Sequence, residues 1–156
     1  MKFSTFIVTQ AVTTNLGATT ARGAVNEMIG RLIEAGALAE ADRRRLVDAV
    51  MRRERKGTTG FGNGVAIPHA KHEAVPGVVG TVAISPQGID FAALDRRPVH
   101  LFFLLLSNPN VPQDHLRAME HIFRSVKNDH LRRFMTQATS VEELLDLLRE
   151  ADEELG

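Results

Sequence analysis

The strongest constraint on the fold is an unbroken run of six apolar residues at positions 101–106. Such a run has no polar side to turn toward solvent, so it is typical of a strand that is covered on both faces. The run is also far too short to cross a bilayer as a helix, which takes about 20 apolar residues. Other elements of the chain must therefore cover this strand from two sides.

Other segments show the patterns of strands and helices. A strand is expected at 78–84, followed by a turn at Pro86-Gln87-Gly88, and a shorter strand is expected near 11–16. Five helices are predicted. The first is capped by Thr19 or Thr20 and ends near Gly36, and the second runs from Glu40 or Ala41 to Lys56 or Gly57. The third begins at Gln113 or Asp114, the fourth lies near 129–136, and the fifth is capped by Ser140 with Glu143 as capping-box partner. The order indicates an α/β (α+β) fold with a mixed β-sheet sandwiched between helices in three layers.

The spacing of apolar residues also predicts which helix faces are buried. In the helix that begins at 113 or 114, the predicted inner face consists of Leu116, Met119, Ile122, Phe123 and Val126. Of the histidines outside any motif, His72, His121 and His130 are expected at the surface, and His100 is expected to be structural.

Composition excludes several classes of function. A length of 156 residues suits a single domain spanning 1–156, and equal numbers of basic and acidic residues argue against a nucleic-acid binder. The absence of cysteine excludes disulfides, thiolate metal sites and thiol catalysis. The first ten residues do not form a signal peptide, so we expect a cytoplasmic protein without direct membrane insertion.

Two stretches carry charge predominantly of one sign. Seven basic residues lie within 43–56, and seven acidic residues lie within 142–154. Both stretches are interpreted as solvated helix faces, and the alternative for the basic stretch is electrostatic guidance of a partner.

A glycine-rich segment leads directly to a histidine. Three glycines within five residues (Gly60, Gly62, Gly64) permit positive φ angles and close backbone approach, and they argue against regular structure. Pro68 fixes its own φ and restricts the residue before it, so the backbone just before His69 is rigid. A rigid approach to an imidazole suggests that the placement of the ring matters, although a histidine that merely ends a loop is an equal alternative.

Three kinds of chemistry fit the residues poorly. His69 and His72 are too few for a zinc site, which usually takes three or four protein ligands. The glycine-rich segment lacks the Gly-Lys-Ser/Thr ending of a nucleotide phosphate loop. Ser85, Ser107 and Ser125 lack the nucleophile-elbow pattern of a serine hydrolase. No metal and no cofactor are expected.

Residues 53–71 carry a resemblance to a known family. The segment resembles the signature of the fructose/mannitol/nitrogen-type enzyme IIA of the bacterial phosphotransferase system, the type-2 IIA domain, through Arg53-Glu54, Thr59-Gly60-Phe61-Gly62 and Ile67-Pro68-His69. A second segment, 114–119, resembles the later His-Leu helix start of that family. The resemblance extends from about residue 11 to residue 148, and its fold is the sandwiched mixed sheet expected above.

The resemblance implies a phosphocarrier, a phosphotransferase that passes phosphoryl groups between proteins. His69 would accept the group, through Nε2, from HPr or a nitrogen-type HPr, and pass it to a IIB domain or use it as a signal to a regulatory target. Arg53 and His115 match active-site positions of the family and would hold the phosphate. Thr59 would bond either the phosphate or its own turn, while Gly60, Gly62, Gly64 and Pro68 would shape the loop.

The destination of the phosphoryl group has two alternatives. A nitrogen-type regulator is slightly favoured by Gly62-Asn63-Gly64 and by the lack of a fused IIB or IIC unit. A fructose/mannitol-type sugar-uptake component is the alternative, because His69-Ala70-Lys71 also occurs in fructose-type sequences and free-standing sugar-system components exist. A histidine-based metal-binding module and an inactive family member are more remote, since His69, Arg53 and His115 are all intact.

Overall fold

A central strand with two apolar faces organises the structure, a computed structural model that describes residues 1–156. Strand β5 (Val99–Ser107) pairs antiparallel with β4 (Val78–Ile89) on one side. On its other side it pairs in parallel with the short strands β2 (Val65–Ala66) and β3 (His69–Lys71), and β1 (Gly60–Gly62) adds antiparallel to β2. The sheet is therefore mixed, as the sequence predicts.

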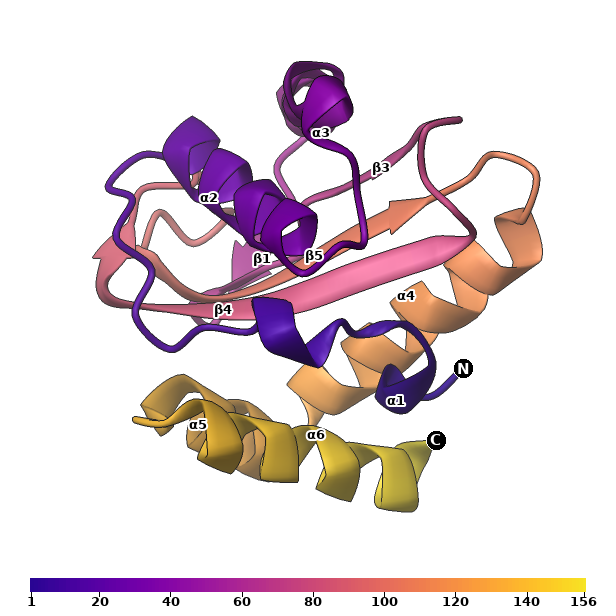
Figure 1. The fold of residues 1–156 in the computed structure, drawn as a ribbon. Helices are drawn as coiled ribbons and strands as arrows, with labels where there is room; N and C mark the ends of the chain where they lie inside the picture. Colours follow the sequence, from indigo (N-terminus) through magenta and orange to yellow (C-terminus); the bar gives the residue numbers. More distant parts are fainter.

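Helices cover both faces of this sheet (Figure 1). Helices α2 (Ala21–Glu34) and α3 (Arg43–Lys56) lie over one face. The other face is covered by α1 (Phe3–Phe6), α4 (Pro112–Lys127), α5 (Asp129–Gln137) and α6 (Val141–Leu155). Three layers result, which confirms the predicted fold class. None of the helices combines the length and the apolarity that a membrane crossing requires.

The alternating side chains of β5 divide the hydrophobic core into two halves. Phe102, Leu104 and Leu106 belong to a cluster of 23 buried residues beneath α2 and α3. Leu101, Phe103 and Leu105 belong to a cluster of 20 buried residues on the opposite face. Because successive strand side chains point to opposite faces, an unbroken apolar run serves both clusters at once.

Both predicted N-terminal helix caps are present, but the predicted capping box at Ser140 is not. Thr20 accepts a hydrogen bond from the backbone N–H of Gly23 at 3.0 Å, and Gly36 has the positive φ of 82° that ends the first long helix. Ser140 accepts from the N–H of Glu143 at 3.1 Å, but the carboxylate of Glu143 accepts from Thr139 rather than from Ser140. A 3-10 turn at Glu40–Asp42 precedes α3, and α4 begins at Pro112.

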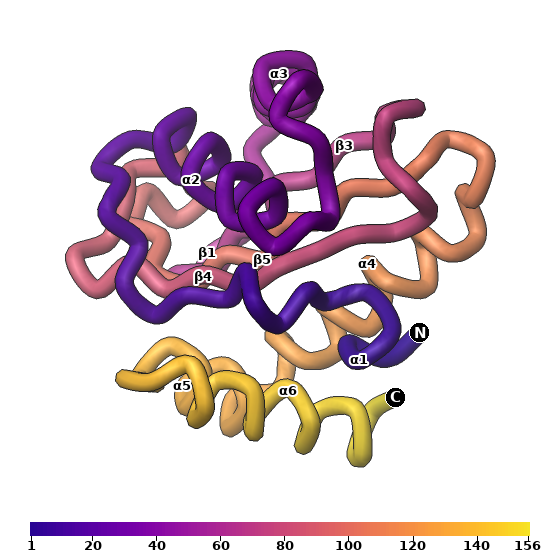
Figure 2. The backbone as a smooth tube through the Cα atoms, viewed as in Figure 1, coloured from indigo at the N-terminus to yellow at the C-terminus, as the bar shows by residue number.

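Three predictions about strands need correction. The glycine-rich segment is regular: β1 and β2 form a hairpin whose turn residues Asn63 and Gly64 have φ of 58° and 74°. The predicted turn at 86–88 lies inside β4, which passes through an irregularity between Ile84 and Ile89. The strand expected near 11–16 is only a single bridge from Thr13 to Ala83, after a 3-10 turn at Thr9–Ala11. Figure 2 shows this N-terminal segment running alongside β4.

The predicted inner face of α4 is wrong at two positions. Leu116 is 59% exposed and Phe123 is 36% exposed, whereas Ile122 and Val126 are buried as expected. The buried face instead includes two histidines, and His121, predicted at the surface, is only 2% exposed. Each buried histidine has a hydrogen-bond partner from another element, which offsets the cost of burying an imidazole.

The partner of His121 is Asp152, which ties the two ends of the chain together (Figure 1). One carboxylate oxygen of Asp152 lies 2.8 Å from Nε2 of His121 and accepts from the N–H of Phe3 at 2.6 Å. The other oxygen accepts from the N–H of Ser4 at 3.0 Å. The carboxylate thus satisfies the first free N–H groups of α1 as a cap from a distant segment.

Replacing Asp152 with alanine is expected to lower the free energy of unfolding by about 2 kcal/mol, because two backbone N–H groups and a buried imidazole lose their acceptor. Urea denaturation at neutral pH measures the change. Glu153→Ala, at an exposed neighbouring position, is the matched control and should change stability by less than about 0.5 kcal/mol. Equal stability of the two variants would contradict the capping role.

Candidate functional site

His69 is held in place by the central strand. It begins β3, where it pairs in register with Leu105 of β5. The carbonyl of Pro68 accepts a hydrogen bond from the N–H of Leu105 at 3.0 Å, so the backbone just before the histidine is anchored to the sheet. The predicted rigid approach is therefore present, and it is supplied by strand pairing as well as by proline.

The geometry determines which ring nitrogen of His69 is available. Nδ1 lies 2.8 Å from the backbone carbonyl oxygen of Ile67. A carbonyl can only accept, so Nδ1 carries the proton and donates it, and the lone pair of the neutral ring is on Nε2. The ring is therefore in the tautomer that presents Nε2 as a nucleophile.

Burial keeps the ring of His69 neutral. It lowers the pKa of His69 below the ordinary 6.5, the hydrogen bond to Ile67 partly opposes this, and the charges of Arg53 and Lys71 lower the pKa further. A neutral imidazole is the form that attacks an electrophile.

The ring of His115 lies beside that of His69, and both line the same cavity. The two ring centroids are 5.8 Å apart, with the ring planes inclined by 53°. Burial, together with the neighbouring His69 and Lys71, lowers the pKa of His115 to about 4. His115 is therefore neutral at pH 7 and can donate only one ring N–H.

An open cavity of about 380 Å³ joins these groups. It brings together His69, His115 and Arg53, three residues that the sequence singles out, and its remaining lining residues are Ala49, Arg52, Lys56, Ala70 and Lys71. Four cationic side chains without a carboxylate make this cavity suited to an anion such as a phosphoryl group. Part of the basic stretch 43–56 thus faces the site rather than bulk solvent alone.

Arg53 approaches the cavity from the end of α3. One of its guanidinium nitrogens donates to the carbonyl of Gly57 at 2.8 Å, which orients the side chain at the helix C-terminus. The remaining donors of the planar fork are free of any other protein partner and suit phosphate oxygens.

Thr59 is not among the residues that line the cavity. It is buried, its hydroxyl bonds to the carboxylate of Glu54, and its backbone N–H donates to the same carboxylate at 3.0 Å. The carbonyl of Thr59 in turn accepts from the N–H of Ile67 at 3.2 Å. A chain of hydrogen bonds thus runs from Glu54 through Thr59 and Ile67 to the ring of His69. Burial raises the pKa of Glu54, and the bonds to Thr59 oppose the rise.

The glycines have distinct positions in the hairpin. Gly62 ends β1 and Gly64 lies in the hairpin turn, with positive φ of 119° and 74°, and neither lines the His69 cavity. Gly60 faces Ala93, whose Cα would lie 3.1 Å from any added side-chain carbon. A side chain at any of these three positions would therefore bring backbone strain or a steric clash.

Several residues at or beside the site were not predicted as site residues from the sequence. Lys71 and Arg52 line the cavity, and Ser107 bonds to His115 at 2.6 Å. A signal for Ser107 exists in the sequence, because it is the polar residue directly after the apolar run 101–106. His72 does not line the cavity, and no group of three or more His, Cys, Asp or Glu side chains is placed to hold a metal ion.

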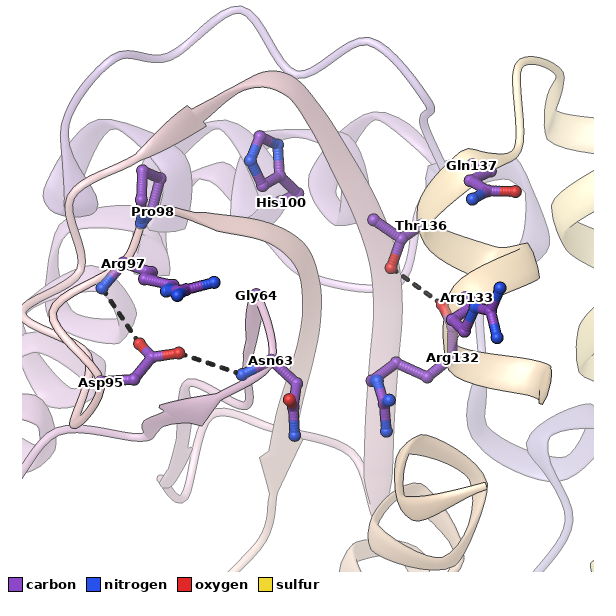
Figure 3. A pocket seen from close by; sticks show the side chains of 10 residues that line it. All are labelled: Asn63, Gly64, Asp95, Arg97, Pro98, His100, Arg132, Arg133, Thr136 and Gln137. Carbon is purple, nitrogen blue, oxygen red and sulfur yellow. Dashed lines mark hydrogen bonds between the residues drawn. The ribbon is translucent and has the colours of Figure 1, made fainter. Parts of the chain in front are cut away.

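A second cavity, of about 450 Å³, lies at the other end of β5, beside His100 (Figure 3). Its arginines include Arg132, which is already bonded to Asp129 and to the carbonyl of Val126. Asp95 also lines it and accepts from the N–H groups of Asn63 and Arg97 (Figure 3). The Nδ1 of His100 lies 2.9 Å from the carbonyl of Ser85, so this ring is held structurally, as predicted.

The pH dependence of the site follows from its histidines. In an NMR titration we expect His69 to titrate below 6.5 and His115 near 4. Protonation removes the lone pair of Nε2, so a reaction that uses this lone pair should lose rate as the pH falls through the lowered pKa of His69, at a lower pH than for an ordinary histidine. Lys71→Gln should move the His69 midpoint upward because it removes a positive charge. A midpoint above 6.5 in the unchanged protein would contradict this account.

The chain is similar in sequence to a family of known proteins. The family model for the phosphoenolpyruvate-dependent sugar phosphotransferase system, EIIA 2, matches residues 5–151. A PTS system fructose-specific EIIA component from Haloferax volcanii is 34% identical over 134 residues, which is 86% of each chain.

Solved structures show the same architecture. The nitrogen regulatory protein IIA-Ntr from Neisseria meningitidis superposes with a TM-score of 0.82 at 25% identity, covering 94% of this chain and 98% of that one. The enzyme IIAMTL of Escherichia coli, in a complex with phosphorylated enzyme IIBMTL, superposes with a TM-score of 0.74 at 20% identity, covering 90% of this chain and 95% of that one.

Proposed function

The chain belongs to the EIIA 2 family of the phosphoenolpyruvate-dependent sugar phosphotransferase system, and on this premise we propose that His69 carries the phosphoryl group. The family is one of phosphocarriers, which transfer phosphoryl groups. The observation that supports His69 most directly is the hydrogen bond from its Nδ1 to the carbonyl of Ile67, which leaves Nε2 as the nucleophilic atom beside Arg53 and His115.

The proposed step is a direct displacement at phosphorus. The lone pair of His69 Nε2 attacks the phosphorus atom of a phosphohistidine on the donor, HPr or a nitrogen-type HPr. The new Nε2–P bond forms while the donor N–P bond breaks, and the donor imidazole keeps that electron pair. The Nδ1 proton stays bonded to the carbonyl of Ile67 throughout, and the charge that develops on His69 is stabilised by this bond.

Positive charge in the cavity stabilises the transferring group. The planar fork of Arg53 binds phosphate oxygens, and Lys71 and Arg52 add charge without a carboxylate to compete with the phosphate. Delivery to an acceptor reverses these steps, with a IIB domain or a regulatory target as the recipient. The E. coli complex of IIAMTL with phosphorylated IIBMTL is the precedent for a IIB acceptor.

Both destinations of the phosphoryl group have relatives in the family. A fructose-specific component and a nitrogen regulatory protein each resemble this chain. We place the regulator first because Gly62-Asn63-Gly64 leans to the nitrogen type. Titrating the phosphorylated chain with IIB domains from the same organism separates the alternatives: rapid loss of phosphate to a sugar-system IIB favours transport.

The experiment that tests the carrier role is labelling with phosphoenolpyruvate, enzyme I and HPr. We expect one phosphoryl group per chain, labile in acid and stable in alkali, as a phosphoramidate should be. Peptide mapping should place it at His69, and nitrogen NMR should place it on Nε2. Label on another residue, or no label with competent cognate donors, would overturn the proposal.

A further inference from the structure

Ser107 bonds to the second histidine of the site. The serine ends β5 and is completely buried, and its Oγ lies 2.6 Å from Nδ1 of His115. His115 is only 6% exposed, lies near the start of α4 and lines the cavity. A contact this short between two buried side chains restricts the orientation of the ring.

The hydrogen of the Ser107 hydroxyl has one available acceptor. A buried hydroxyl normally donates its hydrogen to some partner, and Nδ1 of His115 is the acceptor that the structure places within hydrogen-bond distance. Nδ1 must then be the unprotonated nitrogen of the ring. Since neutral His115 carries one proton, that proton is on Nε2.

The tautomer of His115 determines whether Nε2 presents an N–H or a lone pair to the cavity. Nδ1 is occupied by Ser107, so Nε2 is the ring nitrogen that remains for the cavity shared with His69. An N–H at Nε2 donates to an oxygen of a phosphoryl group on His69. The other tautomer would present a lone pair to the same negatively charged oxygen and repel it.

We propose that Ser107 is a positioning residue for phosphoryl transfer, which selects the His115 tautomer whose Nε2–H donates to the phosphoryl group on His69. Ser107 acts through His115 and does not itself touch the phosphoryl group. The proposal rests on the proposed function of His69 as the carrier.

Nitrogen NMR of the unphosphorylated protein tests the tautomer directly. In the wild type we expect the Nδ1 of His115 to show the shift of an unprotonated nitrogen and Nε2 that of a protonated one. Ser107→Ala should produce a mixture of tautomers. A wild-type ring protonated on Nδ1 would overturn the proposal. This measurement needs no phosphoryl donor, so its outcome is separate from the fate of the carrier proposal.

Transfer kinetics test the consequence. Ser107→Ala should slow phosphoryl transfer to His69 by about tenfold, the effect of one weakened hydrogen bond to a charged group. In a His115→Ala background the same substitution should change the rate by less than about twofold, because the residue through which it acts is gone. Equal slowing in both backgrounds would indicate a general structural effect and overturn the proposal.

Two further variants distinguish an effect on the His115 tautomer from a general loss of folding. Ser107→Thr keeps the hydroxyl and should restore the wild-type tautomer and most of the rate. Ser125→Ala is the matched control, since Ser125 is also completely buried but bonds to the carbonyl of His121 and does not line the cavity. We expect wild-type transfer and the wild-type His115 tautomer from Ser125→Ala. A Ser107→Thr protein that folds but behaves like Ser107→Ala would also contradict the proposal.

Discussion

Replacing His69 with alanine is expected to abolish the acid-labile phosphate completely, because no other side chain of the cavity combines a free nucleophilic nitrogen with a neutral ring. His115 is the nearest alternative, but its Nδ1 is bonded to Ser107 and its Nε2 carries the proton in the tautomer inferred above. His69→Gln should give the same loss while keeping the approximate volume of the side chain. Incorporation of label from phosphoenolpyruvate, enzyme I and HPr is the measurement.

The matched control for His69 is His72→Ala. His72 lies three residues further along the chain, and its Nδ1 accepts from the N–H of Ala74 at 3.0 Å, outside the cavity. This variant should accept the phosphoryl group at the wild-type rate. Label that persists in His69→Ala at the wild-type level would assign the phosphate to another residue.

Replacing Arg53 with alanine is expected to slow phosphoryl transfer by about 100-fold, the usual effect of removing one donor that stabilises transition-state charge. The guanidinium is oriented at the cavity by its bond to the carbonyl of Gly57. Arg53→Lys keeps the charge but not the planar fork, so it should recover only part of the rate. Single-turnover transfer from phosphorylated HPr measures both variants.

Arg53→Ala could also change the transfer rate in two other ways, by raising the pKa of His69 or by disturbing helix α3. Removing the positive charge should raise the pKa of His69, so rates are compared on the high-pH plateau of each protein, where the ring is neutral. Arg55→Ala provides the control for the helix, because Arg55 is an exposed arginine of α3 that does not line the His69 cavity. A rate for Arg53→Ala within about threefold of Arg55→Ala would refute the phosphate role.

The layer arrangement could be predicted because it depends on patterns that are local in the sequence. The apolar run at 101–106 became the central strand, since a segment without a polar side must be covered twice. The caps Thr20 and Ser140 act within three residues of their own positions, so they too could be predicted. The approach to His69 through Pro68 belongs to the same class of local signals.

The predictions that failed depend on contacts between segments that are distant in the sequence. The predicted buried face of α4 is wrong because His115 and His121 are buried where helical spacing predicted Leu116 and Phe123. A buried imidazole is stable only with a partner, and each partner is supplied by another element. The glycine-rich segment is regular because β2 pairs with β5, a contact between residues that lie 36 positions apart in register, Val65 with Leu101.

The sequence by itself determined the helix–sheet–helix layers and the position of His69 after a rigid backbone. Arg53 and His115 were singled out by the resemblance of residues 53–71 and 114–119 to a known family. The sequence indicated Nε2 of His69 only through the family resemblance, and the tertiary structure decided that Nδ1 donates and Nε2 keeps the lone pair. Only the tertiary structure decided that Thr59 bonds within the loop rather than lining the cavity, and that Ser107 bonds to His115. The reason is physical. Periodicity and capping record interactions between near neighbours, whereas the state of a ring nitrogen depends on hydrogen-bond partners that folding brings from separate segments.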